Sequence, residues 1–268
     1  MCKIITIAGQ KGGNGKSTIS ANLAACLALL EKKTLLIDCD PQAHATSLAC
    51  IKNTNFKYNL SSVFWGKTDI CNAVLKTKLN FMDIIPSSIN LFHSSLKLSQ
   101  YSGNEKILKI FLKDIKKNYD FIIIDPPSSF SFLSMTAMIA SNWLIIPFYC
   151  TQNSIKELKI LLKMIKHIKK KYQTNLKIAG IVFNKCNNKN KINTFLNNQK
   201  QINIKTISYS TYIPNDANIK KAEYYGKPVA LYNLKTKASQ AYLKFANEII
   251  SFFNNRGIIN ENHKFKHN

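Results

Sequence analysis

The chain has 268 residues, 46% of them hydrophobic, which is ordinary for a globular protein and enough for one large domain with a sizeable core. No apolar run approaches the roughly 18–20 residues of a membrane span, and the chain enters a strand-like run at once, so we expect neither a spanning helix nor a secretory signal. The formal net charge is +24, and its positive part comes almost entirely from lysine. Such a charge favours a polyanionic partner, either nucleic acid or an anionic membrane. A composition rich in Lys, Asn and Ile explains part of the excess charge.

The first predicted elements are a strand at residues 4–8, a glycine-rich turn and a helix beginning near residue 16. Residues 9–18 read Gly-Gln-Lys-Gly-Gly-Asn-Gly-Lys-Ser-Thr. Strand, glycine-rich turn and helix is the setting of a phosphate-binding loop, because backbone N–H groups converge there and the helix adds the positive end of its dipole. We expect Lys16 to neutralise phosphates and the Ser17 hydroxyl to complete a Mg²⁺ shell. The alternative is a turn without a ligand.

A second predicted strand, at residues 34–38, ends in two carboxylates, Asp38 and Asp40. Its continuous apolar run is typical of a parallel strand buried on both faces. In a doubly wound sheet its carboxyl end lies beside the phosphate loop, where ligands bind. The two carboxylates can then address Mg²⁺ and a water together, although either alone could simply form a turn.

The middle of the chain is less regular up to about residue 103. It contains short predicted helices at 59–65 and 70–75 and a strand at 81–88. An amphipathic helix at 105–117 and an apolar strand ending in Asp125 follow. A strand that ends in Asp is the Walker B arrangement, with the carboxylate on the Mg²⁺ water shell.

The rest of the chain continues the alternation of strands and helices. Further strands are predicted at 144–147 and 179–185, a long helix at 154–172 and a closing helix at 236–253. The lysines on the outer face of the 154–172 helix form either a solvated surface or a nucleic-acid contact. We predict an α/β fold with a doubly wound, mostly parallel sheet and helices on both faces, in a single domain at 1–253 with a polar, flexible tail at 254–268. The seven scattered cysteines lack metal-ligand spacing and are expected to be reduced core residues.

Residues 11–18 resemble the deviant Walker A motif K-G-G-x-G-K-[ST]-T of the ParA/MinD family of ATPases, and residues 38–42 resemble its D-x-D-P-Q motif. The spacing of residues 213–228 is similar to that family's I-P-x-x and A-x-x-x-G-K-P pattern, so the resemblance extends from residue 3 to about 253. It implies a P-loop NTPase fold with ATP and Mg²⁺ as cofactors. It also implies that Lys11 reaches the partner's nucleotide across a dimer interface, that Asp40 positions the attacking water and that Asp38 supports the metal region.

Together with the motif reading, the resemblance implies a set of site residues. The expected nucleotide-binding residues are Lys11, Gly12, Gly13, Asn14, Gly15, Lys16, Ser17, Thr18, Asn184 and Pro214. The expected catalytic residues are Lys11, Lys16 and Asp40, and the expected metal residues are Ser17, Asp38 and Asp125. Asn184 either pairs with adenine or belongs to a plain strand-end turn. The chain departs from the family at Asn14, usually Val, at Pro126 and at Thr151, where Glu is common.

The function that the resemblance implies is DNA partition. ATP would close two subunits into a dimer, the dimer would bind DNA without sequence preference, and a ParB-like centromere-binding protein would stimulate slow hydrolysis, in the cytoplasm on the nucleoid. Relatives carry arginine at the positions of Asn215 and Asn218, so other residues are expected to meet DNA. These are Lys220, Lys221, Lys235 and Lys237.

Two alternatives stay open. One is a MinD-like positioning ATPase, which needs an amphipathic membrane helix near the C-terminus. We expect the apolar side of the 236–253 helix to pack on the core instead, and therefore expect no membrane partner. The other is a biosynthetic P-loop enzyme of the dethiobiotin synthetase or cobyrinate amidase type, which has less reason for so large a positive charge.

Overall fold

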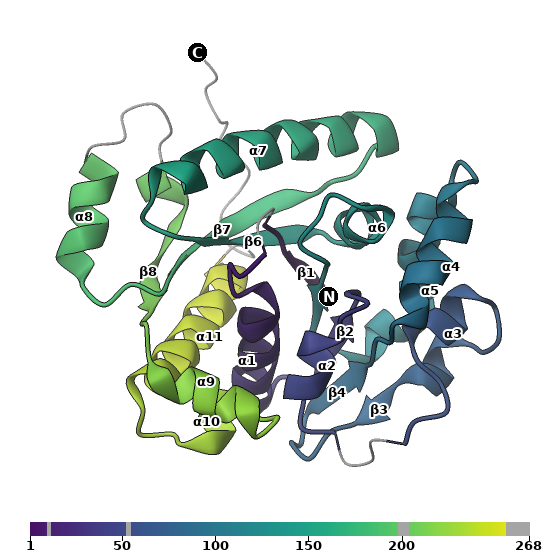
Figure 1. The fold of residues 1–268 in the computed structure, drawn as a ribbon, viewed down its shortest axis with the longest axis horizontal. Coiled ribbons are helices and arrows are strands. Elements are labelled where there is room, and N and C mark those ends of the chain that lie inside the picture. Colours follow the sequence, from purple (N-terminus) through teal and green to yellow (C-terminus); the bar gives the residue numbers. More distant parts are fainter. Residues whose placement is uncertain (10–11, 52–54, 198–203, 256–268) are drawn as a thin grey trace.

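A computed structural model describes residues 1–9, 12–51, 55–197 and 204–255 (Figure 1). The strands are β1 (Lys3–Ile7), β2 (Thr34–Asp38), β3 (Leu75–Lys76), β4 (Met82–Ile85), β5 (Phe121–Asp125), β6 (Trp143–Phe148), β7 (Lys177–Asn184) and β8 (Ser208–Ile213). They form one sheet in the order β3-β4-β2-β5-β1-β6-β7-β8. All neighbours are parallel except the short edge pair β3 and β4. The predicted doubly wound α/β fold is confirmed.

Helices cover both faces of this sheet (Figure 1). They are α1 (Lys16–Leu29), α2 (His44–Leu48), α3 (Leu60–Phe64), α4 (Asn90–Ser99), α5 (Ile107–Ile115), α6 (Phe132–Ala140), α7 (Gln152–Tyr172), α8 (Lys189–Asn197), α9 (Ala217–Tyr224), α10 (Val229–Tyr232) and α11 (Lys237–Asn255). The short 3₁₀ helices are η1 (Ile70–Ala73), η2 (Asn104–Lys106), η3 (Lys116–Asn118) and η4 (Ile204–Ile207).

The central strands are apolar at every position because both of their faces are covered. In β5, Ile123 packs with α1 and α11, while Ile122 and Ile124 pack with α3, α5 and α6 on the other face. All three side chains are fully buried. Full burial of one such side chain stabilises the fold by roughly 1.5–3 kcal/mol, so these strands fix the sheet to which the functional loops are attached.

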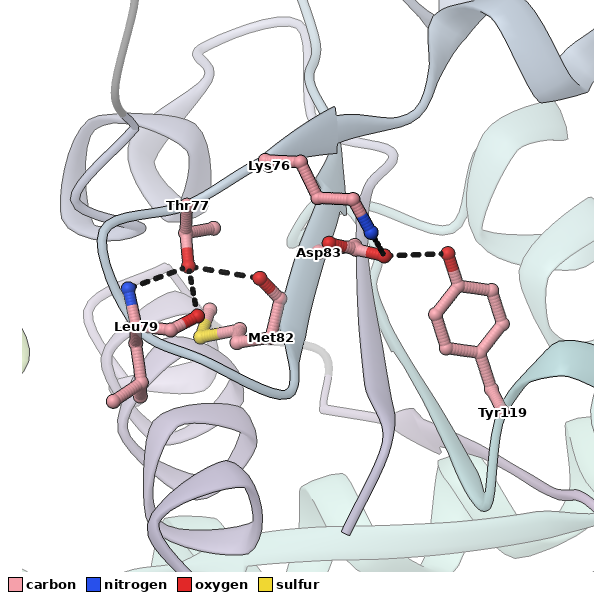
Figure 2. Close-up of polar contacts among 6 residues, drawn as sticks. All are labelled: Lys76, Thr77, Leu79, Met82, Asp83 and Tyr119. Carbon is pink, nitrogen blue, oxygen red and sulfur yellow. Dashed lines mark hydrogen bonds and ion pairs between the residues drawn. The ribbon is translucent and has the colours of Figure 1, made fainter. Parts of the chain in front are cut away.

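The β3–β4 hairpin closes the sheet at the edge near β2 (Figure 2). Lys76 Nζ lies 2.9 Å from Asp83 Oδ2, and the Tyr119 hydroxyl donates to the same oxygen at 2.9 Å. Thr77 donates its hydroxyl to the Met82 carbonyl at 2.8 Å. Tyr119 precedes β5, so these contacts tie the hairpin to the amino end of the central strands, away from their carboxyl ends.

Several helix predictions agree with the structure. Asn59 caps α3 by accepting a hydrogen bond from the Ser62 N–H, and α5 and α7 lie within about two residues of the predicted ranges. The helices α4 and α6 were not predicted. In α7, Leu161 is buried and Leu162 is partly buried against the same core.

The closing helix α11 confirms the prediction of core packing. Phe245 and Ile249 are fully buried, and Phe253 is nearly so. The cysteine prediction was wrong for Cys71, which is exposed at the surface in η1, where the short helix turns its apolar neighbours Ile70 and Ala73 inward. The domain boundary at 253 stays a prediction, and residues 256–268 of the predicted tail lie outside the described residues.

Candidate functional site

The glycine loop after β1 leads directly into α1. Gly13 and Gly15 have φ values of 79° and 74°, in the left-handed region that favours glycine. Gly15 is the N-cap of α1, and a Cβ at this position would lie 2.6 Å from the Asn184 Nδ2 atom. Backbone conformation and close packing therefore both require glycine at Gly15. The loop presents the N-terminus of a buried helix to the carboxyl edge of the sheet, which is the geometry of an anion-binding site.

Lys16 begins α1 and is only 6% exposed. Burial lowers the pKa of its ammonium, whereas the carboxylates of Asp125, Asp40 and Glu157 oppose that change. Acidic groups from three separate segments therefore act on this one buried lysine. A phosphate group would supply the negative charge that a buried cation requires.

Asp125, at the end of β5, has a carboxyl group that fits a metal site. It is fully buried, and its Oδ1 accepts a hydrogen bond from Ser20 Oγ at 3.0 Å. Its Oδ2 has no hydrogen-bond partner among the described residues. Burial, followed by the nearby charge of Asp38, raises the pKa of Asp125 to about 8, against hydrogen bonds from Ser17 and Ser20. A buried oxygen without a partner next to the Ser17 hydroxyl suits Mg²⁺, which prefers oxygen ligands.

Asp38 is fully buried at the end of β2, and its two oxygens contact the next loop and α2. Oδ1 accepts from the Asp40 N–H at 2.9 Å, while Oδ2 accepts from the Thr46 N–H at 2.7 Å and the Thr46 hydroxyl at 2.8 Å. Burial raises its pKa to about 6. Asp38 therefore shapes the loop that carries Asp40, and its expected support of a metal stays a prediction.

Asp40 is partly exposed in that loop, where its Oδ1 accepts a hydrogen bond from the Gln42 N–H at 3.0 Å. Thr46, which sequence reasoning did not single out, links this loop to the segment after β4. Its Oγ1 accepts from the Ser87 N–H at 3.0 Å. The contact joins residues 41 positions apart, so local sequence patterns give no signal for it.

Asn184 lies under the glycine loop. Its Nδ2 donates to the Asn14 carbonyl at 3.1 Å, and its Oδ1 accepts from the Lys185 N–H at 2.9 Å. Pairing with adenine stays a prediction, and the observed contacts are those of a residue that supports the loop. Pro214 follows β8, whose last carbonyl, that of Ile213, accepts from the Cys186 N–H at 3.1 Å, so this segment lies beside the end of β7.

Two further contacts to the glycine loop and α1 were missed by sequence reasoning. The Tyr149 hydroxyl, just after β6, donates to the Gly13 carbonyl at 2.8 Å. The Thr18 hydroxyl donates to Glu223 Oε1 in α9 at 2.6 Å. Residues after β6 and at the end of β7 therefore hold the loop, and α9 holds the first turn of α1.

The expected site residues do not all lie in one place. Gly12 through Thr18, Asp38, Asp40 and Asp125 gather at the carboxyl ends of β1, β2 and β5. Lys11 lies outside the described residues. The four lysines expected to meet DNA are exposed on α9, on the turn before α11 and at the start of α11. None of the described helices has the length and apolar character that crossing a membrane requires.

A glycine loop between β1 and α1, with aspartates at the carboxyl ends of β2 and β5, defines the P-loop NTPase fold. The family model described as "AAA domain" matches residues 2–178. A chromosome-partitioning ATPase Soj from Treponema pallidum (strain Nichols) is 32% identical and covers 94% of this chain and 98% of its own length. The chain belongs to this AAA-domain family, among the Soj and ParA chromosome-partitioning proteins.

Solved structures agree with the fold. The septum site-determining protein MinD complexed with Mg-ADP from Pyrococcus horikoshii OT3 aligns with a TM-score of 0.78 at 22% identity, over 97% of this chain and 100% of that one. Cobyrinic acid a,c-diamide synthase from Mycobacterium smegmatis, with bound ATP analog and magnesium, aligns with a TM-score of 0.78 at 21% identity, over 95% and 96%. At these identities the likeness concerns the fold alone.

Proposed function

We propose that this chain is a DNA-partition ATPase that uses ATP with Mg²⁺ as a switch ligand. The observation that carries the proposal is the buried Lys16 at the start of α1, near the carboxyl groups of Asp125 in β5 and of Asp40 in the loop after β2. A site of this kind binds a polyphosphate and a hydrated cation together. The phosphates neutralise the lysine ammonium, and the cation neutralises the acidic groups beside it.

Each group in the site has a distinct part. Lys16 binds the β- and γ-phosphates, and the loop N–H groups surround them. Ser17 and Asp125 hold Mg²⁺, which neutralises phosphate charge when it is bound. The partly exposed Asp40 orients the attacking water. The hydrogen bond that Asp38 Oδ1 accepts from the Asp40 N–H keeps Asp40 in position for that role.

The proposed active form is an ATP-dependent homodimer in which Lys11 acts on the partner's nucleotide. Lys11→Ala should therefore bind ATP as a monomer and fail to dimerise or to hydrolyse it. Light scattering with and without ATP measures this. A normal ATP dimer in that variant would contradict the trans role of Lys11.

The proposed DNA surface is formed by the exposed lysines at one end of α9 and α11. Asp216 connects these two helices, since its Oδ1 accepts from the Asn218 N–H at 2.9 Å and its Oδ2 from the Ala238 N–H at 3.1 Å. Asp216 thus joins the starts of the two helices that carry Lys220, Lys221 and Lys237, and Lys235 precedes the second of them. Lysine contacts with phosphate carry no sequence information, so binding should be independent of sequence.

The nucleotide site is joined to this surface by the contact between Thr18 and Glu223. Thr18 is in the first turn of α1, and Glu223 is in α9 beside the lysine pair. A change at the glycine loop on ATP binding is therefore passed to α9 through one short hydrogen bond. A ParB-like partner would act on the same switch by stimulating hydrolysis, and the DNA-bound dimer would place the protein on the nucleoid.

The two alternatives have weaker support. Membrane positioning would need a free apolar helix face near the C-terminus, whereas Phe245, Ile249 and Phe253 of α11 are buried in the core. A biosynthetic enzyme of the cobyrinate amidase type is supported by likeness of fold alone. The partition reading is supported in addition by sequence identity along most of the chain.

Co-sedimentation with duplex DNA and with anionic vesicles, each with ATP and with ADP, tests the proposal. Dimerisation doubles the phosphates that are met, and each one contributes roughly −0.9 to the slope of log affinity against log salt. We expect a steeper slope with ATP than with ADP on any duplex, and no ATP-dependent binding to vesicles. Equal slopes in the two nucleotide states would contradict the proposal.

A charge-reversal pair of variants gives the matched control. Changing the four surface lysines to glutamate should flatten the ATP slope while ATP dimerisation persists; these are Lys220, Lys221, Lys235 and Lys237. Four exposed lysines around α5, on the opposite face of the sheet, give a variant of equal charge that should keep the slope; these are Lys106, Lys109, Lys113 and Lys117. If both variants lose DNA binding equally, the total charge of the protein attracts DNA, and the proposed DNA surface on α9 and α11 is wrong.

A further inference from the structure

Two cysteine thiols meet beside the glycine loop. The Sγ atoms of Cys150 and Cys186 lie 3.5 Å apart, one residue after Tyr149 and two residues after Asn184. Both thiols are free, and they come from the ends of β6 and β7, which are neighbours in the sheet. A disulfide has a sulfur separation of about 2.05 Å, so closing the pair would shorten the present separation by about 1.5 Å.

We propose that Cys150 and Cys186 are a modification site, a thiol pair that peroxide oxidises reversibly to a disulfide. Cys150 is partly exposed and can meet a small oxidant, while Cys186 is 5% exposed and lies behind it. The hydrogen bond between the two thiols lowers the pKa of Cys186 and raises the pKa of Cys150, and the nearby Lys191 ammonium acts to lower both. The inner sulfur is therefore ready to attack the outer one.

The reaction balances with hydrogen peroxide as the oxidant. The Cys150 sulfur attacks one oxygen, the O–O bond breaks, Cys150 becomes a sulfenic acid, and the leaving hydroxide takes the thiol proton to form water. The Cys186 sulfur then attacks the Cys150 sulfur, the S–O bond breaks, and the second hydroxide leaves as water with the Cys186 proton. The two thiols lose two electrons and the peroxide gains them. A dithiol reductant reverses the change.

The disulfide would act on the glycine loop, because each cysteine lies within two residues of a side chain that holds the loop. Tyr149 donates to the Gly13 carbonyl and Asn184 to the Asn14 carbonyl. A disulfide between the two segments would restrain Tyr149 and Asn184 at the same time. If the loop must loosen to release nucleotide, oxidation should slow that release. This consequence rests on the proposed ATPase function, whereas the formation of the disulfide does not.

The full-length protein, reduced and then treated with hydrogen peroxide, provides the first test. Digestion without reductant and mass spectrometry should yield a linked Cys150–Cys186 peptide pair, formed without nucleotide and lost on reduction. Cys150→Ser should abolish the pair, and Cys71→Ser, which changes the exposed cysteine of η1, should leave it intact. If Cys71 is oxidised in the wild-type protein and no Cys150–Cys186 link forms, the thiol-pair proposal is overturned.

Release of a fluorescent ADP provides the second test. We expect release on the order of tenfold slower after oxidation, which corresponds to about 1.4 kcal/mol, with recovery on reduction and no effect in Cys150→Ser. Unchanged or faster release in the cross-linked protein would overturn the coupling to the loop. If the disulfide forms but neither the oxidised nor the reduced protein binds nucleotide, the thiol pair would be supported and the proposed ATPase function contradicted.

Discussion

The buried carboxyl group of Asp125 makes a quantitative prediction about the pH dependence of stability. Its pKa is raised from an ordinary value of 3.8 to about 8, chiefly by burial at the end of β5. In the unfolded chain the group is ionised above about pH 4. Across neutral pH the folded protein without ligand therefore holds a proton that the unfolded chain does not hold.

The sign of the effect follows from the direction of the pKa shift. Because the folded-state pKa is raised, the stabilising contribution is complete below the unfolded value and is lost as the pH rises towards about 8. Each pH unit within that window lowers the free energy of unfolding by about 1.4 kcal/mol, or about 3 kcal/mol between about pH 5.5 and 7.5. The pKa of Asp38, raised to about 6, adds a loss in the same direction in the lower part of the window.

Urea denaturation in nucleotide-free buffer with a metal chelator measures this slope. Asp125→Asn keeps a similar shape and an acceptor for Ser20 but does not titrate, so its slope should be flatter by about 1.4 kcal/mol per pH unit. Asp114→Asn, at an exposed position in α5, is the control and should keep the wild-type slope. Equal slopes for wild type and Asp125→Asn, or greater stability at the higher pH, would refute the reasoning.

Three further predictions concern the nucleotide. Lys16→Ala should abolish ATP binding in calorimetry, since it removes the main cation on the phosphates, and micromolar affinity in that variant would exclude the P-loop assignment. Asp40→Ala should retain the ATP dimer and lose turnover by roughly 10²-fold, the scale of a general base or water-positioning group, so normal turnover with DNA and partner present would move that role elsewhere. Tyr149→Phe removes the hydrogen bond to the Gly13 carbonyl and should weaken nucleotide binding by about five- to tenfold, the effect of about 1 kcal/mol, whereas unchanged affinity would show that the contact does not support the bound state.

The sequence by itself determined the sheet class and the core of the site. Hydrophobic runs that end in aspartate predict buried parallel strands, and the carboxyl ends of such strands lie at one edge, so Lys16, Asp38, Asp40 and Asp125 could be placed together before any coordinates were known. The need for glycine at Gly13 is also local, since it follows from the left-handed backbone of the turn before α1. These features depend on neighbours along the chain, which a linear pattern records.

Only the tertiary structure decided which residues hold the glycine loop. Tyr149 contacts Gly13 across 136 positions, and Asn184 contacts Asn14 across 170. Asn184 illustrates the difference, because its position along the chain gives no indication that its amide group donates to the Asn14 carbonyl. The meeting of Cys150 with Cys186 depends in the same way on the parallel register of β6 and β7. Such contacts depend on which strands are neighbours in the sheet, and the spacing of residues along the chain does not indicate that order.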